Sequence, residues 1–184
     1  MFSNIFGYIF GWPFLAPVHR VVAHLSLHAL GYNNMLKESW TGEEWFITHK
    51  LAPTNPRVCL DVGANVGNYT RMLLKHTQAK IYAFEPLPRA YASIQGLSDR
   101  VTTIQAAVSD VDGEAPIFHK SDTDGKASLD SRIRNGTQTM VKLITLKTAM
   151  QTYGITDVDF IKIDTEGNER EVLKGLGDLR PAFV

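Results

Sequence analysis

Two short apolar segments, each ending at a carboxylate, carry the residues best suited to chemistry. Residues 58–70 read VCLDVGANVGNYT, and residues 81–86 read IYAFEP. In the first, Asp61 precedes a glycine turn, which lets backbone approach a ligand where a Cβ would clash. In the second, Glu85 ends the apolar run, and a carboxylate at the tip of a parallel strand can accept hydrogen bonds from two ribose hydroxyls. Together the segments predict a nucleoside-cofactor site.

The turn differs from the one that binds dinucleotides. Those folds use G-x-G-x-x-G to bring a helix N-terminus to a pyrophosphate, whereas this turn reads D-x-G-A-N-x-G-N. An acid at Asp61 would repel a phosphate but suits a cationic ligand. S-adenosylmethionine carries a sulfonium and an ammonium and no phosphate, so the chemistry favours it. A nicotinamide oxidoreductase remains an alternative, disfavoured by Asn65 where a phosphate-binding glycine belongs.

A resemblance to a known family extends over most of the chain. The blocks LDVGANVGNYT, FEPLP, AAVSD and DFIKIDTEGNE occur in that order. With this order and spacing, the chain from about Gly42 onward resembles the FkbM family of S-adenosylmethionine-dependent methyltransferases. The resemblance implies a class I, Rossmann-like fold and O-methylation of a hydroxyl on a small molecule, sugar or glycan.

The same resemblance implies roles for single residues. Glu85 matches the ribose-binding acid, Ala107 falls where backbone meets adenine, and Asp164 falls at the tip of the fourth strand, facing the methyl group. One departure is Lys147, where relatives carry an Asp that caps a helix; Thr148 is expected to take over that cap. The residues that match the cofactor turn are Asp61, Gly63, Asn65, Gly67 and Asn68.

Methyl transfer to an alcohol needs alignment of three atoms and a base for the proton. Asp164, Glu166 and His119 are the candidate bases, of which Asp164 and Glu166 are predicted as catalytic. The alternative is that Asp164 or Thr165 caps the next helix. Some related enzymes hold Mg²⁺ with an acid at this strand tip and further acids after strand five. Any acids after strand five would lie beyond Val184, so the sequence does not specify metal dependence, and no metal is predicted.

Composition excludes several other functions. Lys plus Arg and Asp plus Glu number 19 each, so no overall charge draws the protein to nucleic acid, which is not expected as a partner. The single cysteine, Cys59, lies in an apolar strand and is expected to pack as a small hydrophobe. A chain without an internal disulfide is compatible with a reducing compartment, and a cytoplasmic location is expected.

The N-terminal segment, residues 1–40, is predicted as a helical lead-in. It is rich in aromatics but interrupted by glycine and proline, and fits neither a membrane span nor a signal peptide. Its aromatics are expected to dock on the domain or on a partner, with interfacial membrane attachment as the alternative. Residues 18–30 have helical periodicity, and His24 and His28 are more readily explained as packed or solvated than as metal ligands. Residues 41–51 predict a helix capped by Thr41.

Residues 41–184 are predicted to form the methyltransferase domain. Strands alternating with helices indicate a three-layer Rossmann-like sandwich with a mostly parallel sheet, and 115–119 and 140–146 are expected to pair as an added hairpin. Residues 121–138 are polar and are interpreted as a substrate lid or as disorder. The expected strands are 58–62, 81–84, 101–106 and 160–163, and the expected helices are 68–76, 89–97, 148–153 and 169–176.

The domain is expected to be incomplete, because RPAFV begins strand five at the last residues. The edge left by strand four would then favour self-association and low stability. A non-catalytic or fragmentary protein that binds the cofactor weakly is therefore the alternative function. The sequence does not specify the acceptor or the oligomeric state.

Overall fold

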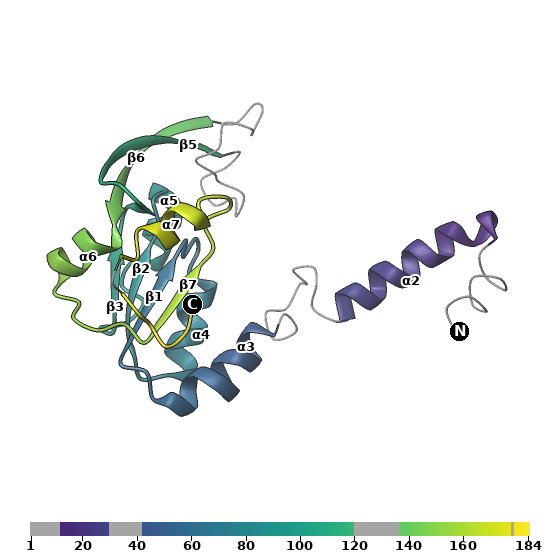
Figure 1. Ribbon diagram of the computed structural model, residues 1–184, viewed down its shortest axis with the longest axis horizontal. Coiled ribbons are helices and arrows are strands. Elements are labelled where there is room, and N and C mark those ends of the chain that lie inside the picture. The colour runs from purple at the N-terminus through teal and green to yellow at the C-terminus, as the bar shows by residue number, and fades with distance from the viewer. Residues whose placement is uncertain (1–11, 30–41, 120–136, 178) are drawn as a thin grey trace. The chain divides into compact units, whose positions relative to one another are not determined.

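The computed structural model describes residues 12–29, 42–119, 137–177 and 179–184. The chain forms two compact units, residues 1–50 and 51–184. Every strand in the described part of the chain lies in the second unit (Figure 1). The predicted lid, except for its last two residues, and the predicted cap Thr41 lie outside the described residues.

A four-stranded parallel sheet with the order β3-β2-β1-β7 forms the centre of the second unit. Its members are β1 (Val58–Val62), β2 (Lys80–Phe84), β3 (Val101–Ile104) and β7 (Phe160–Ile163). Apolar residues fill nearly every position of β1 and β2, as expected for strands buried on both faces. The prediction of a Rossmann-like fold with a mostly parallel sheet is confirmed.

Helices cover both faces of this sheet. On one face, Leu60 and Val62 pack in a core with α6 (Leu146–Tyr153) and α7 (Glu169–Lys174). Alternate residues of the strands point to the other face, where Ala83 of β2 packs with Ile94. That second face is covered by α4 (Asn68–His76) and α5 (Pro88–Ile94), and the ring of Tyr69 in α4 stacks on Phe160 at 6.1 Å. The layers are therefore helix, sheet and helix.

A second sheet, in the order β4-β6-β5, stands beside the first (Figure 1). The antiparallel pair β5 (Gly113–His119) and β6 (Thr137–Thr145) is the predicted hairpin, which is confirmed. Strand three was predicted to continue to Ala106, which is wrong. β3 ends at Ile104, and the chain then forms β4 (Ala107–Ser109), which pairs in parallel with β6.

The start of α6 corrects the prediction that Thr148 caps this helix. The helix begins earlier than expected, at Leu146, so Thr145 is the N-cap and its hydroxyl accepts the N–H of Thr148 at 3.1 Å. Asp112, in the turn before β5, accepts the N–H of Thr145 at 2.7 Å and the hydroxyl of Thr148 at 2.7 Å. A carboxylate distant in sequence therefore supports the helix start next to Lys147.

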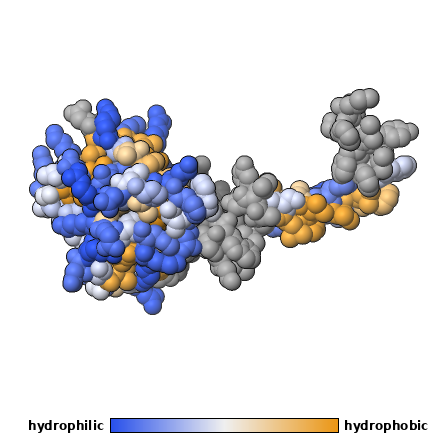
Figure 2. Space-filling model, turned by 90° about the horizontal axis from the view of Figure 1, so that it is seen from below, coloured by the Kyte–Doolittle hydropathy of each residue, from blue (hydrophilic) through white to orange (hydrophobic). Residues whose placement is uncertain are grey.

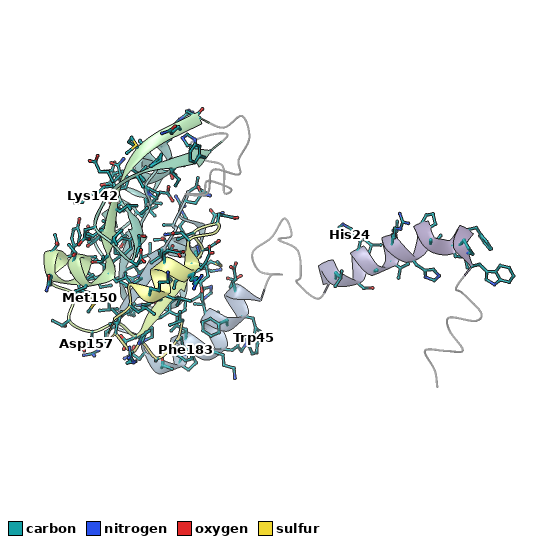
Figure 3. The ribbon with its side chains drawn as sticks, turned by 45° about the horizontal axis from the view of Figure 1, so that its top comes forward. His24, Trp45, Lys142, Met150, Asp157 and Phe183 are labelled. Atoms are coloured by element: carbon teal, nitrogen blue, oxygen red, sulfur yellow. The ribbon has the colours of Figure 1, made fainter. Side chains whose placement is uncertain are left out.

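The C-terminal residues lie beside β7. The N–H of Ile161 donates to the carbonyl of Phe183 at 3.1 Å, and Phe160 and Phe183 form a parallel bridge. Phe183 is labelled in Figure 3. This parallel pairing is what we expect where a further strand begins next to β7.

The first unit contains α2 (Ala16–Ala29), preceded by a short 3₁₀ turn, Pro13–Leu15. Apolar side chains, among them Val18, Val22 and Leu25, are exposed along it (Figure 2). No helix in the described part of the chain is long and apolar enough to cross a bilayer.

The helix predicted for residues 41–51 divides into α3 (Glu43–Phe46) and a π-helical segment, Ile47–Leu51. The prediction that Thr41 is its N-cap is wrong. Gly42 holds that position with φ of 85°, a left-handed conformation that favours glycine.

Candidate active site

Three strands of the central sheet end at the same level. Val62 of β1 is in register with Phe84 of β2 and with Ile163 of β7. The next residue of each strand, Gly63, Glu85 and Asp164, therefore reaches the same carboxyl edge, where ligands bind in open α/β sheets. The structure thus brings together the glycine turn and the two predicted acids.

Gly63 fits against the backbone of the neighbouring strand. Its φ is 81°, and a Cβ at this position would lie 1.9 Å from the carbonyl oxygen of Asp164. The N–H groups of Gly63 and Ala64 both donate to the carbonyl of Phe84, at 3.1 and 2.9 Å. Glycine is therefore required at this position by the contact between two strand ends, in addition to any ligand.

Glu85 lies under the glycine turn, with 6% of its surface exposed. Its Oε2 accepts the N–H of Asn65 at 2.9 Å, and its Oε1 accepts the N–H of Leu87 at 2.9 Å. Burial raises the pKa of the Glu85 carboxyl, while these two backbone hydrogen bonds act in the opposite direction. An ionised carboxylate has about four lone-pair sites, so two remain for a ligand's hydroxyls.

Asp61 is fully buried beneath the same edge. Its Oδ2 accepts the hydroxyl of Thr70, the third residue of α4, at 2.6 Å. Its Oδ1 lies 3.5 Å from the ammonium of Lys162. Asp61 therefore joins β1 to α4 and β7, which places it behind the turn rather than on its open side.

Lys162 was missed by the sequence analysis. Its ammonium donates to the carbonyl of Gly63 at 3.1 Å and lies 3.5 Å from both Asp61 Oδ1 and Asp164 Oδ2. It also lies over the ring of Tyr69, 5.6 Å from its centre. A lysine between Ile161 and Ile163, in a strand of the central sheet, is the signal that could have revealed it, because such a charge requires a partner.

The remaining predicted cofactor residues lie along the turn and the adjoining sheet. Asn65 has a φ of 48°, and Gly67 is the N-cap of α4 with φ of 85°. Asn68, the first residue of α4, is exposed, whereas Ala107 begins β4 and packs partly buried. The turn and the start of β4 determine the backbone positions of these residues, and their contact with a cofactor stays a prediction.

Asp164 and Glu166 lie in the segment that follows β7, and both are exposed. Glu166 has a φ of 51°, which is uncommon for a residue with a side chain. The turn is closed by Glu169, whose Oε1 accepts the N–H of Thr165 at 3.0 Å and that of Gly167 at 2.9 Å.

The alternative role of Asp164 or Thr165 as a helix cap is wrong. The N-cap position of α7 belongs to Asn168, and Thr165 instead donates to Glu169. Asp164 makes its ion pair with Lys162.

His119, the third candidate base, lies at the end of β5 and is buried. Its Nε2 is 2.8 Å from the hydroxyl of Thr139 across the hairpin. This contact connects the two strands of the second sheet and does not bring the ring to Asp164. Among the described residues, no three His, Cys, Asp or Glu side chains are grouped to hold a metal ion.

A pocket of about 460 Å³ lies at the opposite, amino edge of the sheet. One of its lining cations, Arg100, donates to the carbonyls of Leu74, Thr77 and Ala79 at 2.8–3.1 Å, which ties α4 to the sheet. The arginine therefore has a structural role, and the candidate site remains at the carboxyl edge. The lining residues are Asn55, Pro56, Arg57, Gln78, Lys80, Asp99 and Arg100.

Comparison with known proteins agrees with this geometry. Residues 61–182 match the methyltransferase FkbM domain. The chain is 29% identical to the methyltransferase sdnD of Sordaria araneosa, with 68% of this chain and 62% of the relative covered. It is also 29% identical to the hexuronic acid methyltransferase AglP of Haloferax volcanii, with 65% of this chain and 49% of the relative covered.

The chain thus spans about half to three fifths of the length of these curated relatives. No solved structure matches it significantly. The match to the domain model covers Glu85, Asp164, the glycine turn and, apart from residues 58–60 of β1, the strands of the central sheet. From the sheet order, the shared carboxyl edge and this match, the chain belongs to the FkbM family of methyltransferases.

Proposed function

We propose that this domain binds S-adenosylmethionine at the carboxyl edge of β1, β2 and β7 and methylates a hydroxyl of a small molecule, sugar or glycan. The observation that carries the proposal is the common level at which the three strands end, which brings Gly63, Glu85 and Asp164 together. Family membership supports the cofactor. The relative named as a hexuronic acid methyltransferase supports a sugar-like acceptor.

The residues at the edge fit the cofactor's chemical groups. Glu85 is buried, keeps two lone-pair sites open and would accept the ribose hydroxyls. The turn at Asn65 would approach the amino-acid part, with Gly67 and Asn68 beside it, and the backbone at Ala107 would meet the adenine. Asp61 is proposed to act without contacting the cofactor, because its hydrogen bond to Thr70 holds the start of α4 in place beneath the turn.

The cofactor, when bound, supplies a methyl group on a positively charged sulfur that is already a good leaving group. The protein's main task is therefore to align the acceptor oxygen with that methyl group. Asp164 is exposed at the strand tip and is proposed to accept the hydroxyl proton; Glu166, two residues further on, is proposed to help position the acceptor. The ion pair with Lys162 fixes the Asp164 carboxylate.

Transfer of a labelled methyl group from S-adenosylmethionine tests this proposal. The acceptor panel contains glucuronic acid, galacturonic acid and the corresponding neutral sugars, glucose and galactose. Since the proposed acceptor is a hydroxyl, we expect the products to be methyl ethers, which are stable to base. A base-labile product would be a methyl ester and would identify a carboxylate as the acceptor. Cofactor binding without transfer to any acceptor would favour the non-catalytic alternative.

The role of Asp164 is tested with Asp164→Asn. We expect turnover to fall about 10²-fold or more, the usual loss for a general base, with S-adenosylhomocysteine affinity nearly unchanged. Asp157→Asn is the matched control, because Asp157 is an exposed carboxylate that pairs with Arg57 before the start of β7 (Figure 3). Near-normal turnover of Asp164→Asn would leave Asp164 without a role in proton transfer.

A further inference from the structure

Lys162 is a cation within a group of acids at the carboxyl edge. It is in register with Asp61 of β1, and adjacent residues in register point to the same face of a sheet. Only 14% of its side chain is exposed, and its ammonium is 3.5 Å from Asp61 and 3.5 Å from Asp164. Its hydrogen bond to the carbonyl of Gly63, at 3.1 Å, ties it to the glycine turn.

Lys162 is the counter-charge of the buried Asp61 carboxylate. The side chain of Asp61 is fully buried, and one oxygen is occupied by the hydroxyl of Thr70. Among the described residues, its other oxygen has no hydrogen bond and faces the Lys162 ammonium. A buried carboxylate requires such a counter-charge, so Lys162 and Asp61 set the local charge balance as a pair.

The fields of this pair extend to the proposed ribose-binding acid. Burial is the main influence on the Glu85 carboxyl and raises its pKa; among its charged neighbours, Asp61 acts in the same direction and Lys162 opposes it. The charges of Asp61 and Lys162 are therefore felt where the cofactor is proposed to bind.

We infer that Lys162 is a specificity-determining residue whose positive charge limits the site's preference for the cationic S-adenosylmethionine over the neutral product S-adenosylhomocysteine. The inference rests on the proposed function. The two compounds share all other groups and differ by one methyl and one positive charge, so the ratio of their affinities reports the charge of the site.

This balance favours the reaction. A site with excess negative charge would stabilise the cationic ground state more than the transition state, in which that charge is dispersed. Only interactions that are stronger in the transition state accelerate the chemical step. Lys162 offsets the acids at the edge and so reduces this unproductive stabilisation.

Three variants test the inference through the ratio of the two dissociation constants, S-adenosylhomocysteine over S-adenosylmethionine. Lys162→Met keeps most of the side-chain length and removes the positive charge. Asp61→Asn keeps the shape and an acceptor for Thr70 and removes the negative charge. The double variant removes both and restores the charge balance, and Lys147→Met is the control, because Lys147 is exposed on α6.

Each ratio is measured by calorimetric titration at low ionic strength and at about pH 8, where carboxyl groups are ionised. Lys162→Met should raise the ratio about fivefold, and Asp61→Asn should lower it about fivefold, as expected for one charge acting over several ångströms in a partly screened site. The double variant should return to within about twofold of the wild type. A purely structural role for Lys162 would weaken both compounds together and leave the ratio unchanged.

The opposite signs of the single variants decide the inference. Changes in the same direction, or an unchanged ratio in both, would overturn it while the proposed function stands. If Lys162→Met does not fold, Asp61→Asn and the double variant still decide, because their ratios must differ about fivefold. Failure of the wild-type chain to bind either compound would overturn the proposed function itself, and the inference with it.

Discussion

Replacing Gly63 with alanine should destabilise the domain more than the same replacement at a left-handed glycine with open surroundings. The ideal Cβ would lie 1.9 Å from the Asp164 carbonyl oxygen, whereas real Cβ atoms stay at least 3.0 Å from such neighbours. The backbone of β7 must therefore move by at least the difference, 3.0 − 1.9 = 1.1 Å, away from the turn. Such a shift would disturb the ion pair between Asp164 and Lys162.

The expected magnitude has two parts. A left-handed conformation costs a non-glycine residue about 1–2 kcal/mol, and overpacking typically adds about 1–3 kcal/mol. Gly154 separates these parts, since it ends α6 with φ of 63° and a Cβ there would meet nothing within 4 Å. Gly154→Ala should lose only the conformational part, and Gly63→Ala should be less stable than Gly154→Ala by about 1–3 kcal/mol.

Urea unfolding of both variants measures this difference, with the denaturant slope as a check on the unfolded reference state. Gly63→Ala should also lose S-adenosylhomocysteine affinity, because the turn cannot keep its position between Phe84 and Asp164. Equal stabilities of the two variants would refute the argument that the close approach of two strand ends requires glycine at position 63.

Two further predictions concern a buried thiol and an exposed carboxylate. Burial, with Asp159 and Asp61 nearby, raises the pKa of the Cys59 thiol to about 12; Ellman's reagent should therefore label it only after unfolding, and rapid labelling of the native chain would contradict the structure. The hydroxyl of Thr148 and the N–H of Thr145 lower the pKa of Asp112. The stability that Asp112 contributes is present above the ordinary pKa of an aspartate and is lost as the pH falls through the lowered value. Asp112→Asn should accordingly lower the thermal midpoint at neutral pH, with the gap closing in acid, and a gap independent of pH would contradict this assignment.

Sequence patterns predicted the central elements well because strong local signals fix them. From the apolar runs near Asp61 and Glu85, both ends of β1 were predicted correctly and the start of β2 was wrong by one residue. Both ends of the helix after the glycine turn were also correct. β7 also began and ended as predicted, since FIKI lies between polar segments.

The rest depends on contacts between residues distant in sequence. Asp112 supports the start of α6 from a position more than 30 residues earlier, as its hydrogen bond to Thr145 spans 33. β4 forms because Ala107–Ser109 pairs with β6, a strand that begins about 30 residues later in the chain. Lys162 acquires its role only when parallel pairing places it beside Asp61. No local pattern encodes such pairings.

Titration with S-adenosylhomocysteine shows whether the carboxyl edge binds the cofactor through Glu85, as proposed. The wild-type chain should bind this compound and not NAD. Glu85→Ala should weaken binding at least about tenfold, as the loss of a charge-assisted contact implies, whereas Glu114→Ala, on the exposed start of β5, should not change it. Circular dichroism must show that Glu85→Ala remains folded, because it also removes the acceptor for two backbone N–H groups. An unchanged affinity in the folded variant, or tighter binding of NAD by the wild type, would show that Glu85 does not hold an S-adenosylmethionine ribose at this edge.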